Sequence, residues 1–92
     1  MATVVDNPER SRFEIHVDGQ LAGFTEYREH PGVVDFVHTE IDDAYEGQGL
    51  GGQLARGALD QVRTSGRQVI ATCPFIKGWI AKHEDYQDLL AA

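Results

Sequence analysis

The fold of this chain is decided by the stretch Glu46-Gly47-Gln48-Gly49-Leu50-Gly51-Gly52. It joins residues 33–41, which have the composition of a strand, to a run of apolar residues at helical spacing. Four glycines keep side chains away from this turn, so the unpaired N–H groups at the helix start can close on a phosphate. The stretch is therefore predicted to be an anion-binding loop.

Three strands are predicted before the loop. Residues 13–17 alternate apolar and polar side chains, and Asp18-Gly19 suits the two-residue turn of a tight hairpin. Residues 20–28 form the second strand, and His30-Pro31-Gly32 turns the chain into the third, residues 33–41. These strands are expected to form an antiparallel meander.

A helix and a parallel strand are predicted after the loop. The apolar stripe comprises Leu50, Leu54, Ala55, Ala58, Leu59 and Val62, and Ser65-Gly66 ends the helix. Residues 68–73 read as a short buried strand, which should lie parallel to residues 33–41 because the chain returns over a helix. Residues 75–83 suggest a second helix with a terminal turn near Tyr86. The fold class is therefore α/β, with a mixed sheet and a C-terminal helix.

Composition bounds the class of protein. Ninety-two residues suit one domain, expected over residues 13–90, and residues 1–12 show no pattern and are expected to be an N-terminal tail. A net charge of −7 argues against nucleic-acid binding, and no apolar run approaches the roughly 18 residues of a membrane span. The single cysteine, Cys73, fits a reducing compartment and no secretory signal is visible, so a cytoplasmic location is expected.

Other phosphate-binding and metal-binding patterns fit poorly. A dinucleotide fold needs an acid at the end of the next strand, where this chain has Ala71-Thr72-Cys73-Pro74. A P-loop needs Lys followed by Ser or Thr, but Gln53-Leu54 follow the last glycine. The four histidines show no metal-ligand spacing, so no metal is expected.

The loop resembles the acetyl-CoA pyrophosphate loop of the GCN5-related N-acetyltransferases, with Glu46 where the family pattern has Gln or Arg. Three further blocks are similar to the short, single-domain YjdJ-like branch of that superfamily: His38-Thr39-Glu40-Ile41, Cys73-Pro74-Phe75 and residues 83–89. The resemblance implies that acetyl-CoA binds through Ile41 and residues 46–52. It also implies acetyl transfer to an amine, either of a small molecule or of a protein, whose identity the sequence does not give.

Two strand residues are candidate bases for this chemistry. Transfer from a thioester needs a neutral amine and a proton for the departing thiolate. If residues 33–41 are extended, Val34, Phe36, His38 and Glu40 share one face, with His38 and Glu40 just before the loop. A packed histidine and a solvated strand end explain the same two residues equally well.

Two later residues are also candidates. Cys73 could accept the acetyl group as an acyl-cysteine, or pack as a small apolar side chain. The resemblance implies that Tyr86 is a candidate general acid, although helix packing explains it too. Two functions stay open: an amine acetyltransferase, favoured by these four side chains, and a non-catalytic CoA-binding or acyl-CoA-binding module, favoured by Glu46 and by the lack of room for acceptor-binding helices. The oligomeric state is not predicted.

Overall fold

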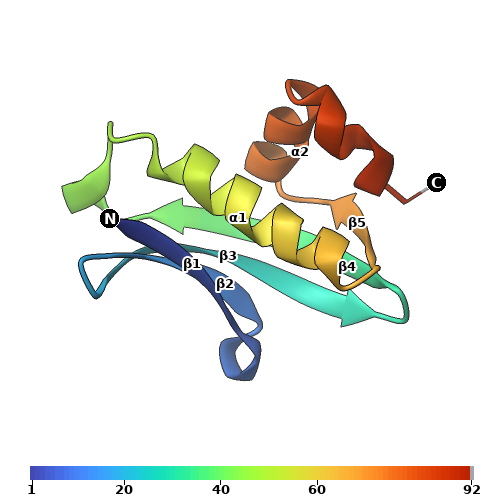
Figure 1. Ribbon diagram of the computed structural model, residues 1–92, viewed down its shortest axis with the longest axis horizontal. Helices are drawn as coiled ribbons and strands as arrows, with labels where there is room; N and C mark the ends of the chain where they lie inside the picture. The colour runs from blue at the N-terminus through green and yellow to red at the C-terminus, as the bar shows by residue number, and fades with distance from the viewer. Residues whose placement is uncertain (92) are drawn as a thin grey trace.

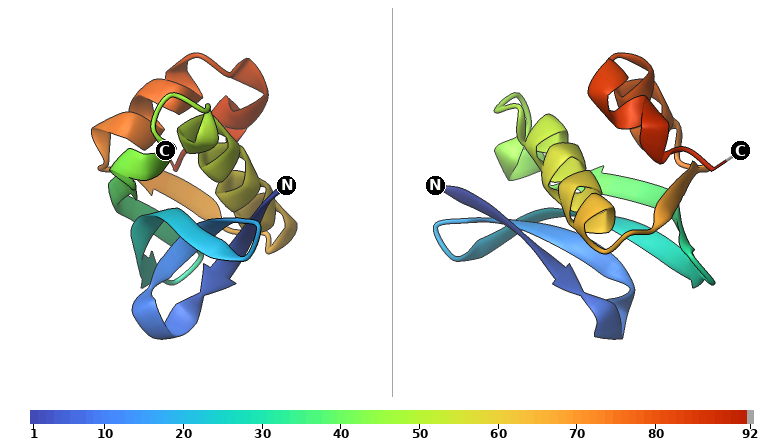
Figure 2. Two further views of the ribbon diagram at one scale, coloured as in Figure 1. Left: turned by 90° about the vertical axis from the view of Figure 1, so that its left-hand side faces the viewer. Right: turned by 45° about the vertical axis from the view of Figure 1, so that its right-hand side comes forward.

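The computed structural model describes residues 1–91, which form a five-stranded sheet with both α-helices on one face (Figures 1 and 2). The strands are β1 (Ala2–Asn7), β2 (Arg12–Val17), β3 (Gln20–His30), β4 (Val33–Ile41) and β5 (Gln68–Ala71), in that order across the sheet. The helices are α1 (Leu50–Thr64) and α2 (Pro74–Ala81), and three short 3-10 turns are η1 (Pro8–Arg10), η2 (Asp43–Tyr45) and η3 (Glu84–Leu89).

The mixed sheet predicted from the sequence is confirmed. Strands β1 to β4 pair antiparallel, and β4 pairs with β5 in parallel. The turn between β2 and β3 has positive φ angles at Asp18 and Gly19, as a two-residue hairpin turn of this type requires. Helix α1 makes the crossover from β4 to β5, and β5 ends at Ala71, two residues earlier than the predicted strand.

The prediction of an N-terminal tail over residues 1–12 is wrong, because these residues contain strand β1. Ala2 and Val4 pack against the core, and the Gln61 side chain donates a hydrogen bond to the Val4 carbonyl oxygen at 3.0 Å. Gly57 of α1 allows this close approach, since a Cβ there would lie 2.7 Å from Val4. A six-residue strand with so few inward apolar side chains carries no clear periodic signal.

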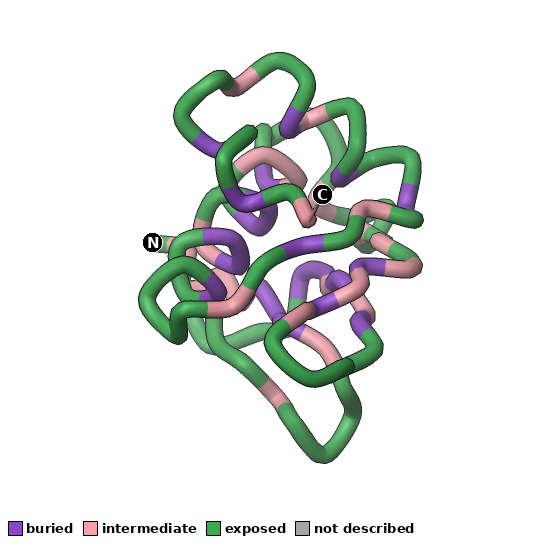
Figure 3. The backbone as a smooth tube through the Cα atoms, turned by 90° about the vertical axis from the view of Figure 1, so that its right-hand side faces the viewer, coloured by how far each residue is buried: buried purple, intermediate pink, exposed green. Residues whose placement is uncertain are grey.

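The core lies between the sheet and the helices that cover it, chiefly α1, with α2 and η3 contributing further residues. Figure 3 marks the buried residues in purple. Every apolar residue of the predicted α1 stripe is buried, and the stripe packs on inward side chains of the strands. The largest fully buried apolar members from the strands are Phe13, Ile15, Val34, Phe36 and Val69. Burial of these apolar side chains is the main favourable contribution to folding, and it keeps α1 packed against the sheet.

A bulge in β4 changes which side chains face the core. Tyr27 pairs with Phe36, but Glu26 pairs with His38, so Val37 has no partner on β3. An extra residue reverses the alternation of a strand. Val34 and Phe36 are therefore followed on the inner face by Thr39 and Ile41. The prediction that His38 and Glu40 share a face with Val34 and Phe36 is wrong.

Candidate functional site

The glycine loop leads into a helix start that no side chain caps. Gly49 is the N-cap of α1 with φ of +72°, and Gly47 has φ of +80°. The first helical bond runs from the Gln53 N–H to the Gly49 carbonyl oxygen at 3.3 Å. The N–H groups of the first turn are thus without a helical partner or a side-chain cap, which is the arrangement that binds anions at helix N-termini.

Two of the four glycines, Gly51 and Gly52, face helix α2, and Gly51 makes the closer contact. A Cβ on Gly51 would lie 2.9 Å from Cζ of Phe75, and one on Gly52 would lie 3.6 Å from Nε1 of Trp79. Helix α2 therefore approaches the first turn of α1 closely. By contrast, a Cβ on Gly47 or Gly49 would meet nothing within 4 Å among the described residues. Their positive φ angles explain why these two positions are glycine.

The remaining loop residues lie beside this helix start. Glu46 is exposed and follows η2, with its N–H donating to the Asp43 carbonyl oxygen at 3.3 Å. Ile41 ends β4 and packs partly against the core. Asp42 is occupied as the cap of η2, since its carboxylate accepts from the Ala44 N–H at 2.9 Å. Carboxylates therefore gather before the loop, and a bound anion would depend on the backbone N–H groups and the helix dipole.

Strands β4 and β5 separate next to this loop. Their pairing covers only the segment from Val33 to Phe36, and the last bond runs from the Cys73 N–H to the Phe36 carbonyl oxygen at 2.8 Å. In the described part of the chain, no strand pairs with β4 from His38 to Ile41 on the side of β5. The backbone on this side of β4 is thus open to an extended ligand.

Cys73 lies at the point where the two strands separate. It is buried, and its Sγ is 3.3 Å from Oγ1 of Thr39, which in turn is 2.9 Å from Oγ1 of Thr25. These three side chains form a hydrogen-bonded chain from β3 to the start of α2, in which Thr25 and Cys73 are buried and Thr39 is partly buried. Sequence reasoning missed Thr39, because its inward orientation depends on the bulge at Val37.

His38 and Glu40 lie on the outer face of the sheet, away from α1. Nε2 of His38 is 3.2 Å from Oε1 of Glu40, and their side chains are 51% and 61% exposed. The ring of His38 also lies 6.3 Å from that of Phe24. The structure brings the two candidate bases together, but on the face of the sheet opposite Thr39 and Cys73.

An open hollow lies where β3 begins and β4 ends, and Glu40 is one of the residues that line it. Its walls are Leu21, Ala22, Gly23, Phe24, Glu40, Ile41, Asp42 and Asp43. Three carboxylates and several apolar side chains therefore border one depression. Such a surface suits a cationic amine better than an anion.

Tyr86 is held against α1. Its hydroxyl donates to Oδ1 of Asp60 at 2.6 Å and accepts from Nη1 of Arg56 at 3.1 Å. Burial raises the pKa of Tyr86 above its usual 10, and the hydrogen bond to the Asp60 carboxylate raises it further. Asp60 lies about 15 Å along α1 from Leu50, from the rise of an α-helix. These hydrogen bonds hold η3 against α1, and they do not connect Tyr86 to Cys73 or Glu40.

The described residues show no group of three or more His, Cys, Asp or Glu side chains that could hold a metal ion. Within the same residues, no helix is long and apolar enough to span a membrane.

The family model for the GCN5-related N-acetyl-transferases matches residues 12–89, so the chain belongs to this family, whose members generally use acetyl-CoA. The chain is also 31% identical over 77 residues to Protein NATD1 of Mus musculus. That alignment covers 82% of this chain and 70% of the mouse protein. The superfamily predicted from the loop and the three blocks is confirmed.

Solved structures of other proteins share the fold. A GCN5-like putative N-acetyltransferase from Staphylococcus aureus gives a TM-score of 0.73 at 24% identity, covering 98% of this chain and 88% of that one. Ard1 from Thermoplasma volcanium gives 0.61 at 16% identity, covering 79% and 54% of the two chains. At these identities the likeness establishes the fold class alone.

Proposed function

We propose that this protein is an acetyl-CoA-dependent N-acetyltransferase. One observation carries the proposal: an uncapped helix start with Gly47 and Gly49 at positive φ lies at the end of a strand whose edge is open from His38 to Ile41. The helix start suits a pyrophosphate. The open strand edge suits an extended chain with amide groups, which is the chemistry of the pantetheine arm.

The acetyl group would be transferred by one of two routes. In the direct route, the neutral amine attacks the acetyl carbonyl carbon, the bond to the CoA sulfur breaks, and the thiolate takes up a proton. Glu40 and His38 would serve as base if the amine approaches from the outer face. In the relay route, Sγ of Cys73 takes the acetyl group first and passes it to the amine. The carboxylates around the hollow favour a cationic amine acceptor, either a small molecule or a lysine side chain.

A second candidate function is a CoA-binding or acyl-CoA-binding module without catalysis. The observation that favours it is the separation of the candidate groups: Cys73 is buried on the inner face, Glu40 lies on the outer face, and the Tyr86 hydroxyl is engaged by Asp60. Glu46 in place of Gln or Arg also reduces the positive character of the loop.

Titration calorimetry with CoA and acetyl-CoA tests the binding site. Gly49→Val should weaken CoA binding at least about tenfold, because a branched side chain would occupy the phosphate approach. Gly66→Val is the matched control, since Gly66 has a similar φ of +78° but lies just beyond the end of α1. Equal CoA affinity in the two folded variants would refute the placement. Mass spectrometry after incubation with acetyl-CoA and candidate amines then separates an enzyme from a binding module.

A further inference from the structure

The outer face of the sheet carries His38 and Glu40 without a covering layer. Both α-helices lie on the opposite face (Figure 2), and among the described residues no helix crosses the outer face. The side chains of His38 and Glu40 are each more than half exposed. Closure of an active site normally excludes water and protects a reactive group from hydrolysis. Water therefore has access to any acetyl group that is presented to this face.

The His38–Glu40 pair is held in place although it is exposed. Phe24 lies between Glu14 and Glu40 in one cross-strand row, and its ring is 6.3 Å from the ring of His38. The guanidinium carbon of Arg12 lies 4.4 Å from the centroid of the Phe24 ring, and Arg12 is itself paired with the largely buried Glu14. The ring beside His38 is thus fixed by a network on the same face, which stabilises the position of the pair.

The pair has the chemistry of a general base. Nε2 of His38 lies 3.2 Å from Oε1 of Glu40, and in the described part of the chain no hydrogen bond engages Nδ1 of His38. A neutral imidazole or an ionised carboxylate can accept a proton from a water molecule within hydrogen-bond reach. A base that is oriented by a second polar group is the usual arrangement for activating a weak nucleophile. Water is such a nucleophile, and it reaches this pair directly.

We infer that this protein also hydrolyses acetyl-CoA, with His38 and Glu40 as the base that activates water, an inference that rests on the proposed function. The water oxygen bonds to the acetyl carbonyl carbon, and the pair takes up one proton from the water. The bond between this carbon and the CoA sulfur then breaks, and the pair passes its proton to the CoA thiolate. The acetic acid that is formed ionises to acetate. Water is the only co-reactant.

The protonation of an amine acceptor favours this second reaction. An alkyl amine with a pKa of about 10 is neutral in roughly one molecule in a thousand at pH 7, and only the neutral amine attacks a thioester. The carboxylates of Glu40, Asp42 and Asp43 border the hollow and favour the charged form of a bound amine. Water needs no such deprotonation before it binds. Hydrolysis therefore competes with transfer whenever the amine is scarce or charged.

Release of CoA thiol in the absence of any amine tests the inference. With acetyl-CoA in large excess, the wild-type protein should release many CoA molecules per chain above the buffer blank, and the acetate should gain one oxygen atom from isotope-labelled water. Many turnovers per chain exclude a single acetylation of Cys73 as the source. No release above the blank in a protein that binds CoA overturns the inference, whereas failure to bind CoA at all refutes the proposed function instead.

Variants of the pair test its role in hydrolysis. Glu40→Gln should lower the hydrolysis rate about a hundredfold, the lower end of the range for a general base, and His38→Gln should lower it as well, both with CoA affinity unchanged. Glu26→Gln is the matched control and should keep the wild-type rate, because Glu26 lies opposite His38 on β3 and is not part of the pair. A rate that the first two variants leave unchanged, or that Glu26→Gln lowers equally, overturns the role of the pair.

Discussion

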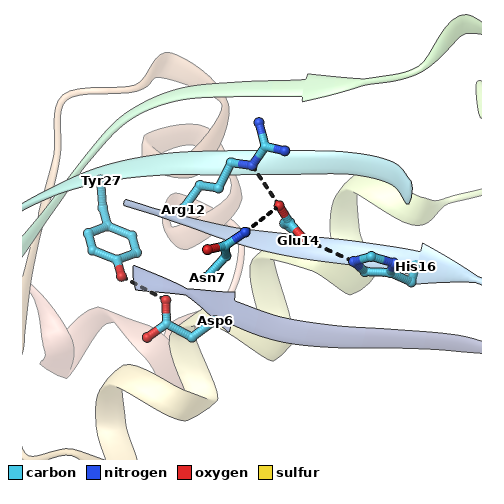
Figure 4. Close-up of polar contacts among 6 residues, drawn as sticks. All are labelled: Asp6, Asn7, Arg12, Glu14, His16 and Tyr27. Carbon is cyan, nitrogen blue, oxygen red and sulfur yellow. Dashed lines mark hydrogen bonds and ion pairs between the residues drawn. The ribbon is translucent and has the colours of Figure 1, made fainter. Parts of the chain in front are cut away.

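Glu14→Gln should lower the free energy of unfolding by about 3 kcal/mol at pH 7. Glu14 lies on the outer face of the sheet, and its side chain is only 10% exposed (Figure 4). Its Oε2 accepts from Nε of Arg12 at 2.8 Å and from Nδ2 of Asn7 at 3.1 Å, and its Oε1 is 3.0 Å from Nε2 of His16. The ionised carboxylate therefore has three polar partners in a site with little water.

The sign and size of the effect follow from the pKa of Glu14. Burial alone would raise this pKa, but the hydrogen bonds from Arg12, His16 and Asn7 lower it from the usual 4.5 to about 2. The folded state thus favours the ionised form by about 3 kcal/mol. This stabilisation is complete above pH 4.5, because the unfolded chain is then ionised too, and it is lost as the pH falls through about 2.

Urea unfolding between pH 7 and pH 2 measures this difference. The gap between the wild-type protein and Glu14→Gln should be largest above about pH 5 and should shrink steadily below it. Glu9→Gln is the control, because Glu9 is exposed and makes no ion pair within the described residues. If the difference in free energy of unfolding between the two proteins is equally large at pH 7 and pH 2.5, Glu14 contributes through its shape and not through its charge.

Three further changes test other parts of the structure. Tyr86→Phe should lower the free energy of unfolding in urea by about 1–2 kcal/mol, because it removes the hydrogen bond from the Tyr86 hydroxyl to the Asp60 carboxylate. The raised pKa of Tyr86 predicts that the wild-type advantage persists below pH 10 and fades above it. Gly57→Ala should lower the melting temperature, since its Cβ would lie 2.7 Å from Val4, and Val4→Ala in the same chain should recover part of the loss. Glu46→Arg should tighten CoA binding at low salt and less so at high salt, and an unchanged affinity would place the Glu46 carboxylate away from the phosphates.

The parts of the fold that local sequence controls could be predicted. The α1 stripe and the Asp18-Gly19 turn depend on residues close in sequence, and both appear where expected. Strand β1 was missed because its two inward apolar side chains, Ala2 and Val4, are too few for a pattern, although its partner β2 follows directly in the chain. Whether such a short, mostly exposed segment joins a sheet is decided by what it packs against, and periodicity cannot reveal that.

The candidate site was predictable in its residues but not in its geometry. His38 and Glu40 are two positions apart in a strand, so they stay side by side whichever face they occupy. The face of the sheet on which His38 and Glu40 lie depends on the unpaired Val37, and no sequence pattern predicted that bulge. The same bulge turns Thr39 toward Cys73, so Thr39 could be recognised as a neighbour of Cys73 only from the structure.

The bulge also makes the two routes for acetyl transfer separable. Cys73 and Glu40 lie on opposite faces of the sheet near its open edge, so a mechanism that needs both would have to move the acetyl group or the amine across β4. If the amine attacks directly, Glu40→Gln should lose most transfer, typically 10²-fold or more for a general base, while Cys73→Ala retains it. If the acetyl group passes through Cys73, acetyl-CoA alone should add one acetyl group that hydroxylamine removes, and Cys73→Ala should abolish both this mass gain and transfer. Equal and complete loss in both variants, with CoA binding intact, would contradict the separation of the two faces.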